Sequence, residues 1–369
     1  MKKCQKMSPM KLLLVIDSLG SGGSQRQMVN LAVAFKEKGN EVSFLVYHPH
    51  LFYGDELRKF EISVTEIIGS NYLARLIKMR RSIRNSHADV ILSFLEAPNF
   101  ISEIAGLPWR KWKLIVGERS ANPRILGSLK SRALRFFHLF ADEIIANSHE
   151  NLKLIKKANP LLKSSKLRVA LNIVDFNVFF PSDDYIFRKE GFLTILVPSS
   201  HQYLKNLDKL IESMKFLTNS EISELRVVWY GDIRDDSFEQ AEKKISTLKL
   251  NQVFAFYPAN KDISRIMQKA DVVGIFSLYE GLPNAICEAM ACGKPVIASS
   301  VGDLPMHIKD ERLLFIPEDP KSIAGVLRYI LSLSKDEFNL IGKNNYCYAR
   351  ENFSSNCIVN EYIKIIGEA

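Results

Sequence analysis

The chain repeats one pattern of apolar and polar positions over most of its 369 residues. A short apolar run rich in Val, Ile and Leu is followed by a polar or glycine-containing turn, and then by a longer segment with apolar residues at helical spacing. The apolar runs lie at 12–16, 41–47, 89–95, 114–116, 141–148, 167–170, 193–198, 227–230, 253–256, 272–276 and 296–298. Strands that alternate with helices predict an α/β fold built on parallel sheets.

The stretch from Asp271 to Pro305 shows this pattern most completely. The run 272–276 leads into a loop, Pro283 suits the first turn of a helix, and Gly293 suits the position just after the end of that helix. A second apolar run follows at once. Strand, loop, helix and strand form the βαβ unit of a parallel sheet, in which ligands bind beyond the carboxyl ends of the strands.

Two carboxylates lie at the ligand-binding end of this predicted unit. Glu280 precedes the helix, and Glu288 lies about a turn into it, on the same side as Asn284. Either one alone is as well explained by a solvated charge, but the pair around this loop favours a ligand. Ionised carboxylates accept hydrogen bonds, so both suit hydroxyl groups. The backbone N–H groups of 282–285 are expected at the same place.

The segment EGLPNAICEAMACGKPVIASSVGDLP, which begins at Glu280, resembles the signature of the retaining glycosyltransferases of family 4, the group 1 glycosyl transferases. The resemblance implies an α/β fold of GT-B type, with two Rossmann-like domains that face each other across a cleft. It implies that Glu280 contacts hydroxyls of the donor sugar and that Glu288 holds the ribose of the nucleotide. The neighbouring donor-site positions are Gly281, Leu282, Asn284 and Ala285.

The length of the chain exceeds that of a usual single hydrophobic core and predicts two domains. We expect an N-terminal, acceptor-side domain over residues 1–181 and a nucleotide-sugar-binding domain over 190–350, joined by the acidic segment 182–185. The family resemblance implies that a C-terminal helix, at about 352–369, completes the first domain.

The five cysteines include no C-x-x-C pair, which argues against a disulfide framework or a zinc site and for a reducing compartment. No apolar run approaches the ~20 residues that span a bilayer, and the run 12–16 is too short for the core of a signal peptide. We therefore expect a cytoplasmic protein.

Positive charge is concentrated in the first half of the chain. Residues 1–181 hold 28 Lys and Arg against 15 Asp and Glu. Two predicted helices there, 72–84 and 126–140, are basic and amphipathic, which suits either an anionic membrane surface or an ordinary surface position. Membrane contact would place the protein at the inner face of the cell membrane. No aromatic-basic motif supports nucleic acid as a partner.

Polar residues at the ends of the first-domain strands are candidates for ligand contact. Gly22 and Gly23 follow the first strand without the G-x-G-x-x-G spacing of a dinucleotide site. The resemblance implies that they approach donor phosphate or acceptor. Glu96 and Asn99 follow the run 89–95 and are acceptor candidates, and Arg119 is one by resemblance to the family.

In the second domain, Lys205 resembles the family lysine that neutralises the diphosphate of the donor. The family arginine that accompanies this lysine is absent, because Ser199 and Ser200 stand in its place. His201 and, from the first domain, Arg26 are candidates for part of the missing charge, which matters because the leaving group becomes negative in the transition state. The remaining donor-site candidates are Gly231, Pro258 and Ala259, of which the last two lie in the turn that presents backbone to the nucleotide base in the family.

These assignments predict a metal-independent, retaining glycosyltransferase of hexosyltransferase type that acts in cell-surface polysaccharide synthesis. Its partners would be a nucleotide-sugar donor, expected to be a UDP-sugar, and a glycan or lipid-linked acceptor. No D-x-D segment or His/Cys cluster with ligand spacing occurs, so we expect no metal and no cofactor, with Lys205 and helix N-termini holding the phosphates. The resemblance implies a same-face route in which the departing phosphate takes the acceptor proton.

Three alternatives stay open at the level of sequence. A nucleotide-sugar epimerase shares the two-domain architecture and would turn over donor without acceptor. A nicotinamide-dependent oxidoreductase is disfavoured by the glycine pattern. A non-catalytic nucleotide-sugar-binding module fits the altered phosphate loop at 199–201, and would bind donor without consuming it.

Overall fold

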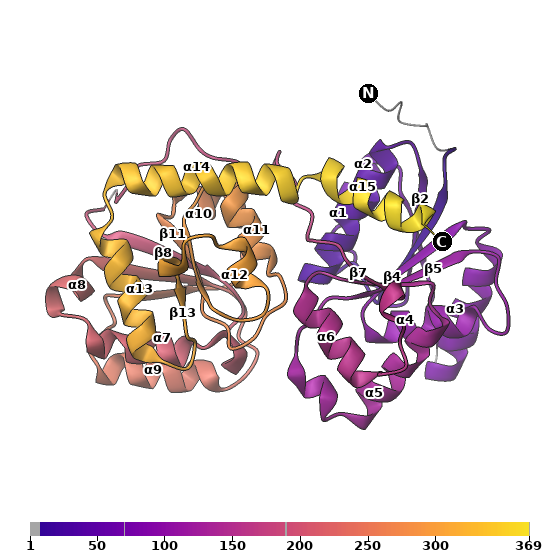
Figure 1. The fold of residues 1–369 in the computed structure, drawn as a ribbon, viewed down its shortest axis with the longest axis horizontal. Helices are drawn as coiled ribbons and strands as arrows, with labels where there is room; N and C mark the ends of the chain where they lie inside the picture. Colours follow the sequence, from indigo (N-terminus) through magenta and orange to yellow (C-terminus); the bar gives the residue numbers. More distant parts are fainter. Residues whose placement is uncertain (1–7, 70, 189, 369) are drawn as a thin grey trace. The chain divides into compact units, whose positions relative to one another are not determined.

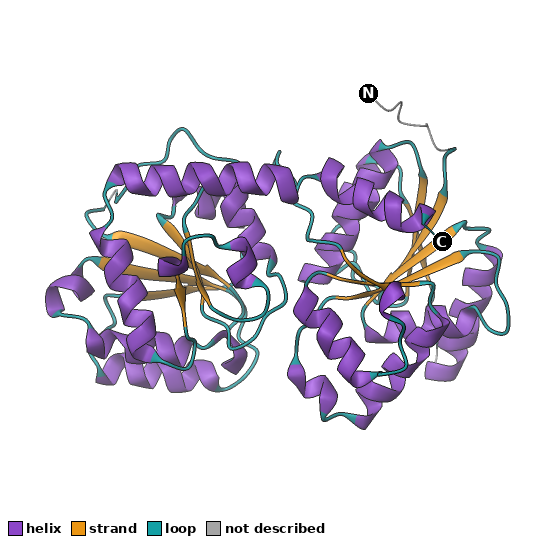
Figure 2. Ribbon diagram, in the orientation of Figure 1, coloured by secondary structure: helices purple, strands orange, loops and turns teal. Residues whose placement is uncertain are grey.

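The computed structural model describes residues 8–69, 71–188 and 190–368, which form two compact units (Figure 1). The first unit contains the chain up to Ile173 together with the residues from Ser355 onward. The second unit is Val174–Ser354. Each unit is a parallel sheet with helices on both faces (Figure 2).

We expected the first domain to end at residue 181. In the structure the boundary between the units lies earlier, between Ile173 and Val174. Val174 pairs with Ser354 in an isolated parallel β-bridge. The side chain of Gln268 donates a hydrogen bond of 3.0 Å to the backbone oxygen of Phe180. The segment after Ile173 therefore packs with the second unit and not with the first.

The sheet of the first unit has the strand order β3-β2-β1-β4-β5-β6-β7. Its strands are β1 (Lys11–Val15), β2 (Glu41–Val46), β3 (Ser63–Glu66), β4 (Val90–Phe94), β5 (Lys113–Glu118), β6 (Glu143–Ala146) and β7 (Leu167–Val169). Its helices are α1 (Gly23–Glu37), α2 (Gly54–Lys59), α3 (Tyr72–Asn85), α4 (Glu96–Ala105), α5 (Leu129–Phe136), α6 (His149–Ala158) and α15 (Ser355–Gly367).

The apolar run of β1 supplies both faces of this sheet. Leu12 and Leu14 belong to the core that also contains residues of α1 and α15. Leu13 and Val15 belong to the opposite core, with residues of α3, α4 and α6. A parallel strand covered on both faces needs a continuous apolar run, because successive side chains point to opposite sides.

The second unit has the strand order β10-β9-β8-β11-β12-β13. Its strands are β8 (Leu193–Pro198), β9 (Leu225–Tyr230), β10 (Phe254–Tyr257), β11 (Val272–Ile275), β12 (Val296–Ser299) and β13 (Leu314–Phe315). Its helices are α7 (Leu207–Ser213), α8 (Asn219–Ser223), α9 (Ser237–Thr247), α10 (Ile263–Lys269), α11 (Asn284–Ala291), α12 (Leu304–His307), α13 (Pro320–Ser332) and α14 (Lys335–Asn352).

The helix that we expected over 126–140 is broken in the structure. Helix α5 ends at Phe136, and a 3₁₀ turn, Phe137–Phe140, follows it. The amide of Asn159 donates hydrogen bonds of 3.1 and 3.5 Å to the backbone oxygens of Arg135 and Phe136. These bonds give hydrogen-bond donors to carbonyl groups at the end of α5, which would otherwise be satisfied by N–H groups of a further helical turn.

Candidate functional site

The strand order of the second unit marks one place for a ligand. From β8 the chain runs outward through β9 and β10, and then returns to the other side of β8 with β11. Ligands of parallel α/β sheets bind beyond the carboxyl ends of two strands at such a reversal. Here the two segments are 199–206 after β8 and 276–283 after β11, which carry Lys205 and Glu280.

The structure brings Lys205 and Glu280 together at this point. The ammonium group of Lys205 forms an ion pair with Oε1 of Glu280, and the hydroxyl of Ser277 donates a hydrogen bond of 2.7 Å to the same oxygen. The two charged side chains are 23% and 17% exposed, so a ligand can reach them. We assigned no role to Ser277 from the sequence, because a serine after a strand is common in turns.

Asn206 fixes the loop that carries Lys205. Its backbone is left-handed, with φ of 61°, a conformation that Asn tolerates better than most residues. Its buried side-chain amide donates hydrogen bonds of 3.1 and 2.8 Å to the backbone oxygens of Phe276 and Pro317. The N–H of Leu278 also donates to the backbone oxygen of Leu204, at 3.0 Å. The loop after β8 is therefore tied directly to the loop after β11.

Helix α11 begins four residues after Glu280. Pro283 is the residue before its first turn, one position earlier than we expected. Gly281 and Leu282 are buried, whereas Asn284 and Ala285 are half-buried. A helix N-terminus carries partial positive charge and unpaired N–H groups, which favour an anion. Gly293 lies just after the helix with φ of 65°, as we predicted.

Glu288 lies inside α11 and is 5% exposed. Its neighbours Cys287 and Ala289 are fully buried, as expected for a helix between a sheet and another layer. Burial, and then the carboxylate of Glu288, raise the pKa of the Cys292 thiol to about 12. Cys292 therefore stays protonated and packs as a small apolar residue.

His201 does not replace the missing cation of the phosphate loop. Its ring is 3% exposed and lies 5.5 Å from the ring of Trp229 and 4.5 Å from that of Phe238, measured between centroids. Burial lowers the pKa of its imidazole, so the ring is neutral at neutral pH. The expectation that His201 supplies part of the charge is corrected, because it occupies an apolar position.

Gly231 follows β9 and packs against the loop after β8. A Cβ atom at this position would lie 2.0 Å from the backbone oxygen of Ser199, so only glycine fits. Beyond β10, the N–H of Ala259 donates to Oδ1 of Asp232 at 3.4 Å, and Pro258 has no N–H to offer. The rings of Tyr230 and Tyr257 stack at 4.9 Å between centroids at the same strand ends.

In the first unit, the glycine loop follows β1. Gly22 precedes the first residue of α1, which is Gly23. The carboxylate of Asp17 accepts hydrogen bonds from the N–H of Ser18 at 2.6 Å and from the amide of Gln25 at 3.0 Å, which hold the loop. Strands β1 and β4 lie at the reversal of this sheet, so the loop is placed as a ligand-binding segment would be.

Two of the acceptor candidates are engaged inside the first unit. Asn99 is fully buried; its amide donates to the backbone oxygen of Gly117 at 3.0 Å, and its side-chain oxygen accepts from Ser93 at 2.8 Å. Asn99 therefore links β4 to β5 and offers no atom to an acceptor in this conformation. Arg119 donates to Asn172 at 2.6 Å and stacks over the ring of Phe94 at 4.9 Å.

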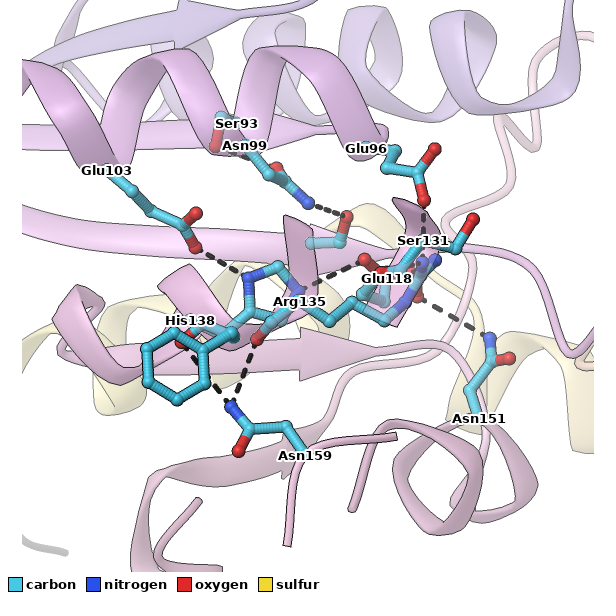
Figure 3. A network of polar contacts seen from close by, with 12 residues as sticks. Ser93, Glu96, Asn99, Glu103, Glu118, Ser131, Arg135, His138, Asn151 and Asn159 are labelled. Carbon is cyan, nitrogen blue, oxygen red and sulfur yellow. Dashed lines mark hydrogen bonds and ion pairs between the residues drawn. The ribbon is translucent and has the colours of Figure 1, made fainter. Parts of the chain in front are cut away.

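The third acceptor candidate, Glu96, belongs to a network that the sequence did not reveal (Figure 3). Arg135 donates to Glu96 at 2.7 Å and to Glu118 at 2.8 Å. The ring of His138 lies between Oε1 of Glu103, at 2.6 Å, and Oε1 of Glu118, at 3.1 Å. No sequence signal could identify the network, because its members lie on α4, β5, α5 and the 3₁₀ turn after α5 and are polar residues of ordinary spacing.

Burial opposes the charge of His138, but Glu103 and Glu118 raise the pKa of its imidazole to about 9. Burial also opposes the charge of Glu118, yet His138 and Arg135 lower the pKa of its carboxyl overall. His138 is therefore an imidazolium at neutral pH, and it is neither a metal ligand nor a solvated histidine.

Within 8–69, 71–188 and 190–368, no group of three or more His, Cys, Asp or Glu side chains is arranged to hold a metal ion. In the same ranges, no helix has both the length and the apolar character required to cross a membrane.

Two protein-family models match adjoining parts of the chain. Residues 183–346 match the model described as glycosyl transferases group 1. Residues 21–178 match the model described as glycosyltransferase family 4. Together the two matches include every predicted site residue of both units.

Two curated relatives match over nearly their whole length. The GalNAc-α-(1→4)-GalNAc-α-(1→3)-diNAcBac-PP-undecaprenol α-1,4-N-acetyl-D-galactosaminyltransferase of Campylobacter jejuni is 25% identical, over 97% of this chain and 99% of its own. The N-acetyl-α-D-glucosaminyl L-malate synthase of Bacillus anthracis is 23% identical, over 96% of each chain. Among solved structures, Anabaena HepE in complex with UDP-glucose has a TM-score of 0.84, with 19% identity over 98% of this chain and 100% of that one.

Proposed function

This chain belongs to the group 1 glycosyl transferases of family 4. From that premise we propose that it transfers the sugar of a UDP-sugar donor to a hydroxyl of a glycan or lipid-linked acceptor. The observation that carries the proposal is the meeting of Lys205 and Glu280 at the strand reversal of the second unit. A cation for the phosphates and a carboxylate for sugar hydroxyls then stand side by side.

The choice of UDP and of the acceptor class is supported by similar proteins. HepE, which has the same fold, is solved with UDP-glucose and with UDP and glucose. The Campylobacter jejuni relative is named for an acceptor that carries a glycan on undecaprenyl diphosphate. An acceptor of this kind would place the reaction in cell-surface polysaccharide synthesis.

In the proposed reaction, the bond between the anomeric carbon and the diphosphate oxygen breaks as the acceptor oxygen bonds to the same face of that carbon. The acceptor proton passes to the departing phosphate, and the sugar keeps its anomeric configuration. Lys205 and the N-terminus of α11 stabilise the negative charge that develops on the leaving group. Glu280 holds sugar hydroxyls, and Glu288 holds the ribose. This arrangement requires no metal ion.

The remaining donor contacts are proposed around these groups. Gly281, Leu282, Asn284 and Ala285 present the start of α11, while Gly231, Pro258 and Ala259 frame the base. Gly22 and Gly23 of the first unit are proposed to approach phosphate or acceptor. Arg119 is carried forward as an acceptor residue only through its backbone position, because its guanidinium binds Asn172.

The proposal is tested by saturation-transfer NMR with UDP-, GDP- and ADP-sugars. We expect UDP-sugars to bind the wild-type chain and to bind Glu288→Ala at least about tenfold more weakly, since the ribose loses a charged hydrogen-bond acceptor. Donor should be consumed with an acceptor present, and the product should keep the anomeric configuration of the donor sugar. Folded protein that binds none of the three donors, or that interconverts the donor sugar without an acceptor, would refute the proposal.

We also propose contact between the first unit and an anionic membrane. On α3, Tyr72, Leu73 and Ile77 are 52%, 64% and 58% exposed, and on α5 Leu129 is 82% exposed. Part of the predicted charge is internal, because Arg84 donates to the backbone oxygen of Ala105 at 2.9 Å. Exposed apolar side chains on a basic unit suit an interfacial position.

A further inference from the structure

A buried chain of ion pairs ends at the carboxyl edge of the first sheet. It runs from Glu103 through His138, Glu118 and Arg135 to Glu96, as Figure 3 shows. The side chains of the four inner members are between 0% and 5% exposed, whereas that of Glu96 is 36% exposed. The network is thus closed at one end and open to solvent at the other.

The open end lies where a ligand is expected. Glu96 is the first residue of α4 and follows β4 with one residue between them. Strands β1 and β4 are the pair at which the strand order of this sheet reverses. Ligands bind beyond the carboxyl ends of such a pair. Glu96 is therefore placed on the β4 side of that position, with the glycine loop after β1 on the other.

The backbone before Glu96 is strained. Leu95 has φ of 78° and ψ of 154°, a region that is essentially restricted to glycine. Such conformations cost about 1–3 kcal/mol each and cluster where function fixes the position of a group. Here the strain turns the chain from β4 into α4 so that the first helical residue is Glu96.

The network carries a larger free-energy cost of desolvation than an apolar core would. Burying several charges carries a desolvation penalty that hydrophobic residues of similar volume would avoid. The geometry leaves one atom for another purpose: Oε1 of Glu96 accepts from Arg135, while across the described residues no hydrogen bond or ion pair reaches its second carboxylate oxygen. A carboxylate oxygen held in this way can accept a hydrogen bond from a hydroxyl.

The charge balance defines what can bind. The open end presents the carboxylate of Glu96, whereas both cations of the network, Arg135 and His138, are buried and paired. Burial raises the pKa of the Glu103 carboxyl, which lies at the closed end. Arg135 already pairs with two carboxylates and does not present its charge to a third anion. The open end thus repels phosphate and carboxylate groups and favours neutral hydroxyl groups.

We propose that Glu96 is the residue that selects an uncharged, hydroxyl-bearing sugar unit of the acceptor, and that Arg135 is a positioning residue that acts through it. The proposal rests on glycosyl transfer as the function. It gives the polar network of α4, β5 and α5 a role in acceptor specificity beyond holding the first unit together.

The test uses saturation-transfer NMR on the full chain with two kinds of probe. UDP reports the donor side, and a panel of methyl glycosides of glucose, galactose, mannose and N-acetylgalactosamine reports the acceptor side. We expect Glu96→Gln to weaken binding of the contacted glycoside by about tenfold or more, while UDP affinity stays unchanged. Glu41→Gln is the matched control, because Glu41 is exposed, forms an ion pair with Lys11 and is the first residue of β2, at the amino ends of the strands.

Arg135 is tested through a double-mutant cycle with Glu96. If Arg135 acts by holding Glu96, Arg135→Gln weakens glycoside binding in the wild-type background but has little further effect in Glu96→Gln. Arg135→Lys should restore part of the affinity, since a lysine can still pair with one carboxylate. A purely structural role of Arg135 would give equal losses in both backgrounds, and the assignment of Arg135 as a positioning residue would then be wrong.

Other outcomes separate this proposal from the proposed function. If UDP binds but no glycoside contacts the wild-type chain, or if Glu96→Gln and Glu41→Gln behave alike, Glu96 does not select the acceptor and the donor assignment stands. Tighter binding of L-malate than of every glycoside, lost in Glu96→Gln, would also overturn it. If UDP does not bind, the proposed function fails, and the assignment of Glu96 as an acceptor-selecting residue fails with it; the glycoside comparison then shows only whether Glu96 binds a sugar hydroxyl.

Discussion

At the scale of single residues, the ion pair between Lys205 and Glu280 holds two opposite charges together at the strand reversal of the second unit. Each charge compensates the other, and Ser277 adds a hydrogen bond to the carboxylate. A lysine ammonium has three donors, of which Glu280 uses one. Under the proposed function, an entering diphosphate takes the other two donors, and Glu280 keeps an oxygen for a sugar hydroxyl.

The first prediction concerns the charge of Lys205. Lys205→Met should lower the rate of donor consumption by about 10²–10³-fold, because a preorganised group that stabilises the leaving charge is lost. Lys209→Met is the control, since Lys209 lies nearby on α7 and pairs with Glu212 at 2.7 Å. The rates are measured as UDP release at saturating donor. Equal rates for the two variants would show that Lys205 does not stabilise the leaving group.

The second prediction concerns the pH dependence of stability. The pKa of His138 is raised from 6.5 to about 9 in the folded chain. Its contribution to stability is therefore complete below pH 6.5 and is lost as the pH rises through 9, by up to about 3 kcal/mol. Urea unfolding across this range should show the decline.

The matched variant for this prediction is Glu103→Gln. It removes the carboxylate closest to the imidazole, so the decline should begin at lower pH. An unfolding profile that is flat from pH 6.5 to 9, or one that Glu103→Gln leaves unchanged, would contradict the assignment of His138 as a buried imidazolium.

At the scale of elements, the loop after β8 is built by its contacts with the loop after β11. Asn206 joins them through two carbonyl groups, and Gly231 lets the β9 turn approach Ser199. His201 anchors the same loop in an aromatic cluster with Trp229 and Phe238. The element thus positions Lys205 by packing, although its usual arginine is missing.

The third prediction separates the two contributions of Asn206. Asn206→Ala should destabilise the chain by about 2–4 kcal/mol, because it removes the amide and replaces Asn at positive φ by a residue that tolerates the left-handed conformation less well. Asn206→Gly removes the same hydrogen bonds without the backbone penalty and should be about 1 kcal/mol more stable than Asn206→Ala. Urea unfolding with and without UDP measures both effects. Identical stability of the two variants would show that the left-handed backbone carries no cost here.

At the scale of the whole molecule, charge divides the chain into two parts of different character. The basic half corresponds largely to the first unit, and the acidic excess lies in the second, which holds Lys205 and Glu280. The first unit also exposes apolar side chains, on α3 and α5. This division suits a protein that meets an anionic surface with one unit and a nucleotide with the other.

The fourth prediction tests the membrane contact. The chain should float with vesicles that contain phosphatidylglycerol and not with pure phosphatidylcholine, and high salt should weaken the binding. Leu73→Ser with Ile77→Ser should reduce it by about tenfold or more, because two side chains lose apolar contact. Leu340→Ser, at an exposed position of α14 in the second unit, is the control. Equal flotation of all variants would exclude α3 as the contact.

The sequence alone determined the alternation of strands and helices, the family and the positions of Glu280 and Lys205. These features are local: apolar runs and turn residues specify strands and helix ends, and the motif from Glu280 onward is contiguous. The same local logic identified the helix from Asn284 and the turn at Gly293 with an error of one residue at Pro283. The prediction was wrong at residues 126–140, where helix α5 ends at Phe136. Asn159, which is distant in the sequence, donates hydrogen bonds to the last carbonyl groups of that helix.

The tertiary structure decided which polar residues meet. Asn99 and Glu96 both lie on α4, yet the side chain of Asn99 is buried and bonded to β4 and β5, whereas that of Glu96 is partly exposed. From the sequence, His201 was a candidate for a positive charge, but the structure buries it among aromatic rings. The sequence assigned no role to His138, which the structure places between two glutamates from other elements. The reason is physical: the charge and reach of a side chain depend on its burial and on partners far away in sequence, which the spacing of residues does not encode.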